Sequence, residues 1–299
     1  MKNNSKKEQT IIYLHIPKTG GLTLYSVFDH IYPQDNIYTL FPTKGDKPVK
    51  KLRQLPDEEK RHIKVLRGHF GFGRHDLLPQ PCTYITMLRD PVERIISHYY
   101  YVLQIPEHEL HKKVKGTGMG LAEYVRSGIS RELNNGQTRA ISGLKSDYDY
   151  GENPREKLMT AKENLKKYFS VVGLVEKYDE SLILLKREFG WDWPVYTKNN
   201  VTKKKVARQK IPGSTIEIIK EYNRLDIDLY EYAVKLFAEK VRGRGDGFSE
   251  EVEQFKALNK SYEEEVRRQE GKPVRFLGLK RTIKKLGRML AQRGGSTNP

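Results

Sequence analysis

The chain has 299 residues, of which 37% are hydrophobic, so it can bury a core without disulfide or metal staples. Its aromatic content of 10% excludes disorder over most of the length. Lysine and arginine number 55 against 38 acids, a formal net charge of +17. We therefore expect a polyanionic partner, namely nucleic acid, an acidic membrane surface or a phosphorylated ligand.

The single cysteine, Cys82, excludes an intramolecular disulfide and a zinc site built from cysteines. The first residues, MKNNSKKEQT, lack the apolar region of a signal peptide. No stretch approaches the roughly 18 apolar residues of a membrane span. From these features we expect a cytoplasmic protein.

Strands alternate with helices in the first half of the chain. Short apolar runs rich in β-branched residues predict strands over 10–16, 62–69 and 83–88. The last of these precedes a predicted helix, with Asp90 as its N-cap and Glu93 at the spacing of a capping box. This alternation predicts an α/β fold in which helices cover both faces of a mainly parallel sheet.

The second half is mostly helical in pattern. We predict helices over 154–169, 178–189 and 214–241, with a short strand at 171–175. The glycine-rich residues 243–247, GRGDG, mark a flexible break. We therefore place a domain over residues 1–245 and a charged helical tail over 246–299. Residues 248–269 carry both signs of charge and are typical of a solvent-exposed helix.

The strongest local motif is Pro-Lys-Thr-Gly-Gly at residues 17–21, between a predicted strand and a predicted helix. Glycines allow a ligand close to the backbone, and the N-terminus of a helix attracts anions. The side chains available to such an anion are Lys18, Thr19 and Thr23, with the backbone of Gly20 and Gly21. The motif is not a Walker A loop. An ordinary strand-to-helix turn with a solvated lysine is the alternative.

A second motif follows the third predicted strand. Arg89 lies where open α/β sheets bind ligands, and Ser97 lies two turns into the next helix. The two side chains are candidates to hold one phosphate from two directions. Alternatively, Arg89 pairs with a local carboxylate and Ser97 lies on the helix surface.

A third motif, Arg-Gly-His-Phe, places His69 at the end of the second predicted strand. A histidine there can serve as a general base near neutral pH, although an isolated histidine is more often structural. Neither His69 with His75 nor His108 with His111 has the carboxylate or thiol cluster that a metal site needs. We therefore expect no metal.

Taken in order, the segments HIPKTGG, GHF and MLRDPVERIISHY resemble the Golgi-type carbohydrate sulfotransferases. The likeness is greatest to the heparan sulfate 6-O-sulfotransferases, with the 2-O-sulfotransferases and bacterial relatives nearby. Residues 133–139, LNNGQTR, are similar to that family's Asn-Asn-x-Gln-x-Arg segment. The resemblance covers roughly residues 10–241.

This resemblance implies a P-loop-like three-layer domain that transfers a sulfuryl group from 3′-phosphoadenosine 5′-phosphosulfate (PAPS) to a hydroxyl group. It assigns the 5′-phosphosulfate to residues of the 17–21 loop and to Thr23, including Lys18, Thr19, Gly20 and Gly21. It assigns the 3′-phosphate to Arg89 and Ser97, and matches His69 to the catalytic histidine. Residues 200–203, NVTK, fall where relatives close a loop over the nucleotide.

The resemblance implies a glycan or glycolipid acceptor, but residues 101–131 align too poorly to identify it. His111, Lys112, Lys113 and Lys115 lie in that stretch and are candidates to meet an acidic acceptor, unless they form a solvated loop. Two other functions stay open: a P-loop-like nucleotide kinase and a basic nucleic-acid-binding protein. The absence of a Walker A pattern and of a zinc-finger or RNP-type segment speaks against them, so we expect no nucleic acid.

The last part of the tail is strongly basic. After Glu270 there is no acid, and eight lysines and arginines follow. Over residues 274–293, a helical wheel places five apolar side chains within about 80° of one another and the basic side chains opposite. Such a helix can lie in an anionic membrane interface, so we expect peripheral attachment at the inner face of the membrane. Packing of the apolar stripe on the catalytic domain is the alternative.

Overall fold

The computed structural model describes residues 9–41, 47–144, 154–197 and 208–269. Within them, a five-stranded sheet has the strand order β2-β3-β1-β4-β5, and every pair of neighbouring strands is parallel. The strands are β1 (Thr10–Leu14), β2 (Ile37–Leu40), β3 (Val65–Gly68), β4 (Cys82–Leu88) and β5 (Phe169–Leu174).

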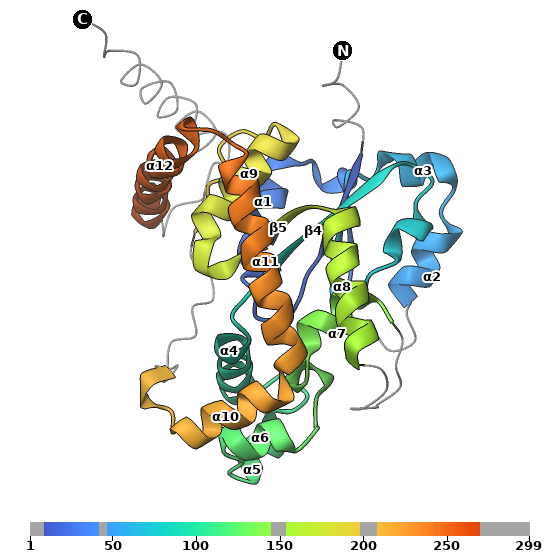
Figure 1. Ribbon diagram of the computed structural model, residues 1–299. Coiled ribbons are helices and arrows are strands. Elements are labelled where there is room, and N and C mark those ends of the chain that lie inside the picture. The colour runs from blue at the N-terminus through green and yellow to red at the C-terminus, as the bar shows by residue number, and fades with distance from the viewer. Residues whose placement is uncertain (1–8, 42–46, 145–153, 198–207, 270–299) are drawn as a thin grey trace, which may run out of the picture.

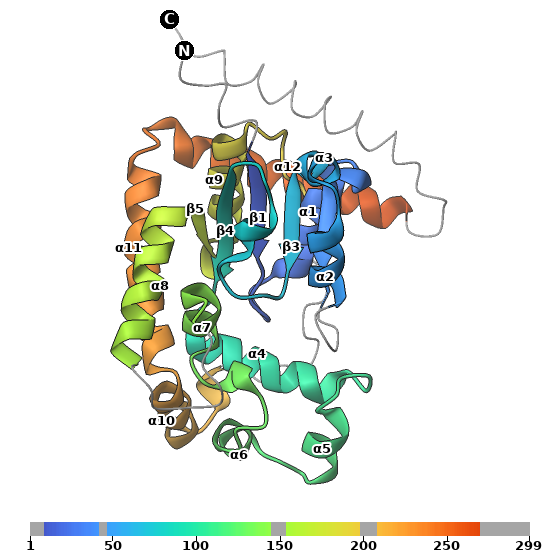
Figure 2. The same ribbon diagram turned by 90° about the vertical axis from the view of Figure 1, so that its right-hand side faces the viewer.

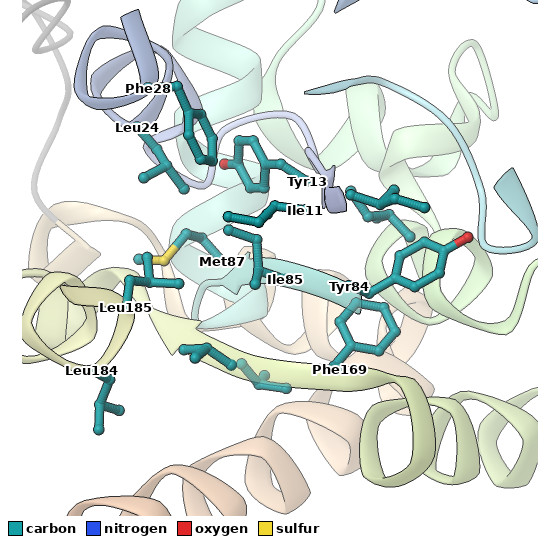
Figure 3. Close-up of a cluster of buried hydrophobic side chains, with 14 of the residues drawn as sticks. Ile11, Tyr13, Leu24, Phe28, Tyr84, Ile85, Met87, Phe169, Leu184 and Leu185 are labelled. Carbon is teal, nitrogen blue, oxygen red and sulfur yellow. The ribbon is translucent and has the colours of Figure 1, made fainter. Parts of the chain in front are cut away.

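Helices lie on both faces of this sheet, as Figure 2 shows. The α-helices are α1 (Gly21–Ile31), α2 (Lys47–Gln54), α3 (Asp57–His62), α4 (Pro91–Gln104), α5 (His111–Gly116), α6 (Leu121–Arg126), α7 (Gly136–Ser142), α8 (Pro154–Tyr168), α9 (Tyr178–Phe189), α10 (Gly213–Tyr222), α11 (Arg224–Arg242) and α12 (Gly247–Gln269). Single 3₁₀ turns are η2 (Gln34–Asn36), η3 (Arg74–Leu77), η4 (Arg131–Leu133), η5 (Val175–Lys177) and η6 (Arg208–Lys210). One outer layer contains α1 and α9, which cover the face of the sheet that carries Tyr13 and Met87 (Figure 3). The opposite layer contains α2, α8 and α11 (Figure 2). The predicted three-layer α/β/α fold with a parallel sheet is confirmed.

The main core covers both faces of the sheet, and the part that positions the site lies between the sheet and α1. All five residues of β1 are buried, as expected for a central strand that is covered on both faces. Tyr13 points toward Phe28 of α1, and their ring centroids are 5.7 Å apart (Figure 3). Full burial of a side chain such as Phe28 contributes about 1.5–3 kcal/mol. This packing fixes α1, and therefore the loop before it, relative to the end of β1.

A second core lies beyond the carboxyl ends of the strands, where α4, α5, α6 and α10 meet (Figure 1). Its buried side chains are Val92, Ile95, Ile96, Val102, Val114, Met119, Tyr124, Val125, Leu133 and Ile219. These helices follow β4, so they build up the structure next to the edge of the sheet where α/β proteins bind ligands.

One predicted helix differs from the observed structure, and one observed strand was not predicted. The prediction of one helix over 214–241 is wrong, because Asn223 separates α10 from α11. Its side-chain amide donates to the carbonyls of Leu133 and Ile219, at 3.0 and 2.9 Å, and its oxygen accepts from the backbone of Asn135 at 3.1 Å. The four residues of β2 form a strand that the sequence did not predict.

The helix predicted over residues 248–269 is confirmed as α12, but the prediction that solvent surrounds it is wrong. Phe248, Val252, Phe255 and Leu258 are buried in the main core, and α12 packs against α9. Glu251 adds ion pairs to Lys186, at 2.8 Å, and to Arg187 on α9. The division at residue 245 stays a prediction, although α12 shares its core with the preceding residues.

The basic segment 274–293 lies outside the described residues. Among the described helices, none combines the length and the apolar character needed to cross a membrane.

Candidate active site

The loop at residues 17–20 connects the end of β1 to the N-terminus of α1. Gly20 has a φ of 75° in the left-handed region and carries no side chain that would cap α1. The first amides of α1 are therefore available to an anion. Gly21 is also needed, because a Cβ there would lie 1.8 Å from Nε2 of His15.

Lys18 is the charged group of this loop. Its backbone has a φ of 70°, which is unusual for a residue other than glycine and is found mainly at strained functional sites. Its Nζ lies 3.7 Å from the ring centroid of Tyr101 on α4, so the ammonium group points toward the helices that follow β4. Burial, and to a smaller extent the charge of Arg89, lower the pKa of Lys18 from 10.5 to about 8.

This low pKa predicts a pH dependence of anion binding. The ammonium form of Lys18 prevails below about pH 8, so affinity for adenosine 3′,5′-bisphosphate is full there. As the pH rises above about 8, the charge is lost and we expect Kd to rise by up to about tenfold per pH unit. Titration calorimetry from pH 7 to 10 checks this. The matched variant Lys18→Arg keeps its charge, so its Kd stays flat; an equally flat curve for the unaltered chain contradicts the prediction.

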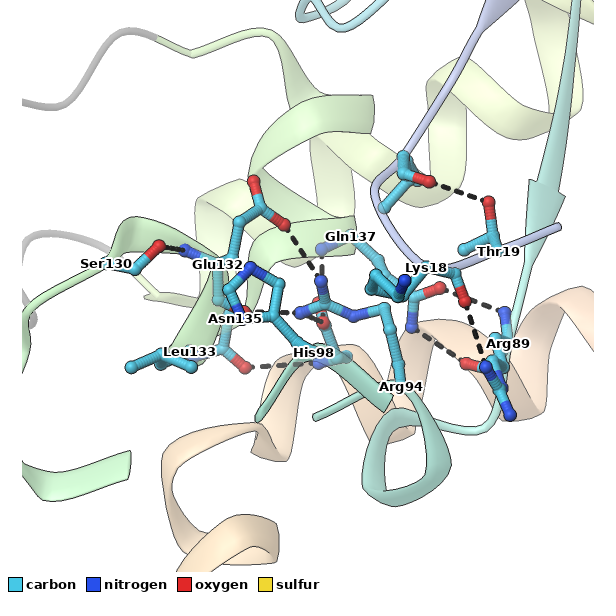
Figure 4. Close-up of polar contacts among 12 residues, drawn as sticks. Lys18, Thr19, Arg89, Arg94, His98, Ser130, Glu132, Leu133, Asn135 and Gln137 are labelled. Atoms are coloured by element: carbon cyan, nitrogen blue, oxygen red, sulfur yellow. Dashed lines mark hydrogen bonds and ion pairs between the residues drawn. The ribbon is translucent and has the colours of Figure 1, made fainter. Parts of the chain in front are cut away.

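Arg89 reaches from the end of β4 to the same loop. Its Nη1 donates to the carbonyl of Lys18 at 3.1 Å, and its Nη2 lies 3.7 Å from Glu93 (Figure 4). Burial lowers the pKa of Arg89, while the nearby carboxylates of Glu176, Glu93 and Asp90 oppose this shift. The Nε of Arg89 is buried and has no hydrogen-bond partner in the described structure. The Nε atoms of Arg74 and Arg94 are buried and unpaired in the same way, so this feature is shared by three arginines of the described structure.

The N-terminus of α4 differs in one detail from the predicted capping box. Asp90 is the N-cap, since its carboxylate accepts from the amide of Glu93 at 2.9 Å. The amide of Asp90 donates to Glu176 at 3.1 Å rather than to Glu93, whose carboxylate lies near Arg89 instead.

The segment 133–139 holds the backbone around Arg89. Gln137 accepts from the amide of Arg89 at 3.0 Å and donates to its carbonyl at 2.9 Å. The carboxylate of Asp226 in turn accepts from the amides of Gln137 and Thr138 at the N-terminus of α7. Arg94, fully buried, pairs with Glu132 at 2.8 Å and with Asp226 at 3.6 Å (Figure 4). This network fixes Arg89 from behind and leaves its guanidinium facing the loop.

Three other predicted ligand residues, Thr19, Thr23 and Ser97, have no hydrogen bond to Arg89 in the described structure. Thr19 is buried, and its hydroxyl donates to the carbonyl of Ile16 at 2.8 Å, which stabilises the loop. Thr23 is half-buried in the first turn of α1. Ser97 is buried on α4, and no hydrogen bond joins it to Arg89 in the described structure. Their roles as nucleotide ligands stay predictions.

His69 follows β3 and is exposed. Its Nδ1 lies 2.8 Å from the backbone carbonyl of His15. A carbonyl only accepts, so Nδ1 carries the hydrogen, and Nε2 of the neutral ring has a free lone pair. The ring also packs on that of His15, with centroids 4.2 Å apart. This arrangement suits a general base whose proton-accepting nitrogen faces solvent.

His15 and Tyr101 were not predicted as site residues. His15 is buried, and burial, His69 and Lys18 together hold its pKa well below the usual value, so its ring stays neutral. Its packing between His69 and Gly21 sets the spacing between the base and the anion loop. For His15 the motif HIPKTGG contained a signal, namely a polar residue in a buried apolar run. Tyr101 gave none, because only the fold brings it to Lys18.

The four candidate acceptor residues on α5 differ in burial. His111 is buried, and its Nδ1 donates to the carbonyl of Val102 at 2.9 Å. Lys112, Lys113 and Lys115 are exposed on α5. Residues 200–203 lie outside the described residues.

Two hollows of about 240 and 370 Å³ lie away from this site. They are lined by residues next to the amino ends of β1, β4 and β5, such as Gln9, Thr83 and Phe169. In the part of the chain that the structure describes, no three histidine, cysteine or acidic side chains gather as metal ligands do. The candidate residues Lys18, Arg89 and His69 lie at the opposite, carboxyl edge of the sheet.

The fold and the site define an α/β protein in which a strand-to-helix loop, an arginine after the neighbouring strand and a histidine lie at one edge of a parallel sheet. The sequence model of the family described as Galactose-3-O-sulfotransferase matches residues 1–271. The chain belongs to that family. The predicted relationship to carbohydrate sulfotransferases is confirmed.

The chain is similar to curated sulfotransferases that are named for different sugars and positions. Galactose-3-O-sulfotransferase 3 of Bos taurus is 24% identical over 263 residues, which cover 80% of this chain and 59% of the relative. Heparan-sulfate 6-O-sulfotransferase 1 of Gallus gallus is 28% identical, covering 76% and 66%. Heparan sulfate 2-O-sulfotransferase 1 of Homo sapiens is 24% identical, covering 78% and 72%. The match thus spans just under three fifths of the galactose-3-O-sulfotransferase from Bos taurus.

Proposed function

We propose that the chain is a sulfotransferase that moves a sulfuryl group from PAPS to a hydroxyl of a carbohydrate acceptor. The observation that carries this proposal is the convergence of Lys18, Arg89 and His69 at one edge of the sheet in a member of this family. The relatives named for galactose and for heparan sulfate support a carbohydrate as the acceptor class.

The residues present suit such a donor. Its 5′-phosphosulfate needs a concave backbone with free amides, which Gly20 and the first turn of α1 provide. Its 3′-phosphate needs a strong hydrogen-bond donor, and the guanidinium group of Arg89 beside the loop is one. PAPS supplies an activated sulfuryl group whose S–O bond to phosphate breaks as the acceptor oxygen bonds to sulfur.

The side chains of the protein have separate tasks in this reaction. His69 accepts the acceptor proton at Nε2, while its Nδ1–H stays bonded to His15. Lys18 and the N-terminus of α1 stabilise the negative charge that grows on the leaving phosphate oxygen. As in phosphoryl transfer, positioning and electrostatics dominate, so a base, a lysine and a helix terminus supply the catalytic groups.

A thermal-shift experiment tests the donor assignment. Adenosine 3′,5′-bisphosphate should stabilise the protein without Mg²⁺, by about 2.7 kcal/mol at a hundredfold excess over Kd, and ATP should not. The opposite result, stabilisation by ATP and Mg²⁺ alone, contradicts sulfotransfer and favours a nucleotide kinase.

Radiolabelled sulfate transfer to a panel of glycans, glycolipids, phenols and tyrosyl peptides tests the acceptor class. Incorporation into glycans or glycolipids supports the proposal. Activity confined to phenols or tyrosyl peptides overturns the carbohydrate part of it.

For location, we propose a cytoplasmic enzyme that the basic segment 274–293 holds at an anionic membrane. Each basic residue near such a surface contributes about 1 kcal/mol, so several together give reversible binding. The full chain should sediment with anionic liposomes in low salt and be released in high salt. A chain that ends after residue 269 keeps α12 and serves as the control. Equal sedimentation of both chains contradicts the proposal.

A further inference from the structure

An exposed aromatic residue follows the strand next to the one that precedes the proposed base, at a position that neither the motifs nor the comparisons single out. Phe41 follows β2 directly and is 65% exposed, more than the other exposed large hydrophobic side chains of the described structure. A single exposed hydrophobic residue is common on protein surfaces. The position of Phe41 at the end of a strand next to β3 is what suggests a function for it.

Phe41 and His69 each come directly after a strand, and the two strands are neighbours. The last printed pair of the register joins Leu40 of β2 to Gly68 of β3, so Phe41 and His69 are the first residues beyond it. Two residues before Phe41, Thr39 pairs with Arg67, and Nε of Arg67 donates to the hydroxyl of Thr39 at 3.0 Å. Because side chains alternate along an extended chain, we infer that Phe41 and His69 continue the face on which Thr39 and Arg67 meet.

The same register extends to β1. Tyr13 pairs with Arg67, and the amide of His15 donates to the carbonyl of Gly68 at 3.0 Å. His15 and His69 are in contact, and Phe41, His69 and His15 all lie at the carboxyl edge of three adjacent strands. Of the three, His15 is buried and Phe41 is exposed.

The strand order separates the donor side from the acceptor side. Arg89 follows β4 and the anion loop follows β1, whereas His69 follows β3 and Phe41 follows β2 (Figure 2 shows β4, β1 and β3 side by side). The base thus has the anion loop on one side and Phe41 on the other. Neighbouring strands are about 4.8 Å apart, close to the width of one sugar ring.

We propose that Phe41 is the acceptor platform, on which a pyranose ring of the acceptor stacks so that one of its hydroxyls meets Nε2 of His69. This inference rests on the proposed sulfotransfer to carbohydrate. The face of an aromatic ring is negative and attracts the polarised C–H groups on the apolar side of a pyranose. Phe41 therefore favours acceptors with a pyranose ring. The position at which this ring stacks decides which of its hydroxyls reaches Nε2 of His69 and is sulfated.

Steady-state kinetics on the full chain test the platform, with N-acetyllactosamine and a desulfated heparan tetrasaccharide as acceptors at saturating PAPS. We expect Phe41→Ala and Phe41→Leu to raise the acceptor KM about tenfold, as the loss of one stacking contact implies, with kcat within about twofold. Phe41→Tyr keeps an aromatic face and should retain the KM. Met159→Ala removes another half-exposed hydrophobic side chain, on α8, and should change nothing.

A binding measurement separates this inference from the proposed function. In Phe41→Trp, addition of either saccharide should change the tryptophan fluorescence, whereas the unaltered chain, with its two native tryptophans, should respond little. If the chain sulfates neither saccharide but this response occurs, the platform stands and the proposed reaction fails. An unchanged KM in Phe41→Leu, or a fluorescence response equal to that of the unaltered chain, overturns the platform. So does a KM effect confined to phenolic acceptors.

Discussion

Replacing His69 by alanine should lower kcat for sulfotransfer by about 10²–10⁴-fold, the usual contribution of a general base. The Kd for adenosine 3′,5′-bisphosphate should stay nearly constant, because the nucleotide is bound by the anion loop and Arg89 and not by His69. His69 accepts through Nε2 only because Nδ1 donates to His15. The variant retains this backbone carbonyl but has no nitrogen to take the acceptor proton.

His75→Ala provides the matched control. His75 lies on η3, where its Nδ1 is 3.0 Å from the hydroxyl of Tyr84 and its ring packs on Phe72 and Tyr168. These contacts give His75 a structural role. In the folded His75→Ala protein, kcat should therefore stay within about threefold of the value for the unaltered chain. Normal turnover in His69→Ala together with a large loss in His75→Ala would transfer the role of base to His75.

Replacing Arg89 by glutamate should remove the preference for adenosine 3′,5′-bisphosphate over adenosine 5′-monophosphate. Arginine–phosphate contacts are among the strongest hydrogen bonds, and the change also introduces repulsion. The loss of a charged contact in a buried site costs about 2–5 kcal/mol, so the bisphosphate Kd should rise by more than about 30-fold. Competition calorimetry with the two nucleotides measures the preference directly.

The fold should survive this change. Gln137 bonds to the backbone of residue 89, and the Arg94–Asp226 pair stays intact. Arg242→Glu, on the exposed end of α11, makes the same change in net charge far from the site. It should leave both affinities unchanged. A preserved preference in Arg89→Glu would remove Arg89 from the nucleotide site.

Local sequence patterns predicted the parts of the molecule that depend on local chemistry. Four strands were predicted because buried parallel strands are continuous apolar runs, and β1, β3, β4 and β5 are buried nearly throughout. The strand β2 escaped because it lies at the edge of the sheet, where three of its four residues are only half-buried and form no continuous apolar run. The apolar spacing of Phe248, Val252, Phe255 and Leu258 was visible in the sequence. It would have predicted the buried face of α12, but the many charges of this segment obscured it.

For the site, the sequence determined the candidate residues: Lys18 in a glycine-rich turn, Arg89 after a strand and His69 after another. Each follows from a short motif whose local structure is set by neighbouring residues. Only the tertiary structure decided how they are held. The bond from His69 to the carbonyl of His15 spans 54 residues, and the bond from Arg89 to the carbonyl of Lys18 spans 71. The strand order that brings Phe41 and His69 to the ends of neighbouring strands is likewise a property of the sheet. Such contacts depend on strand order, which no local pattern encodes, because it results from packing helices on both faces of one sheet.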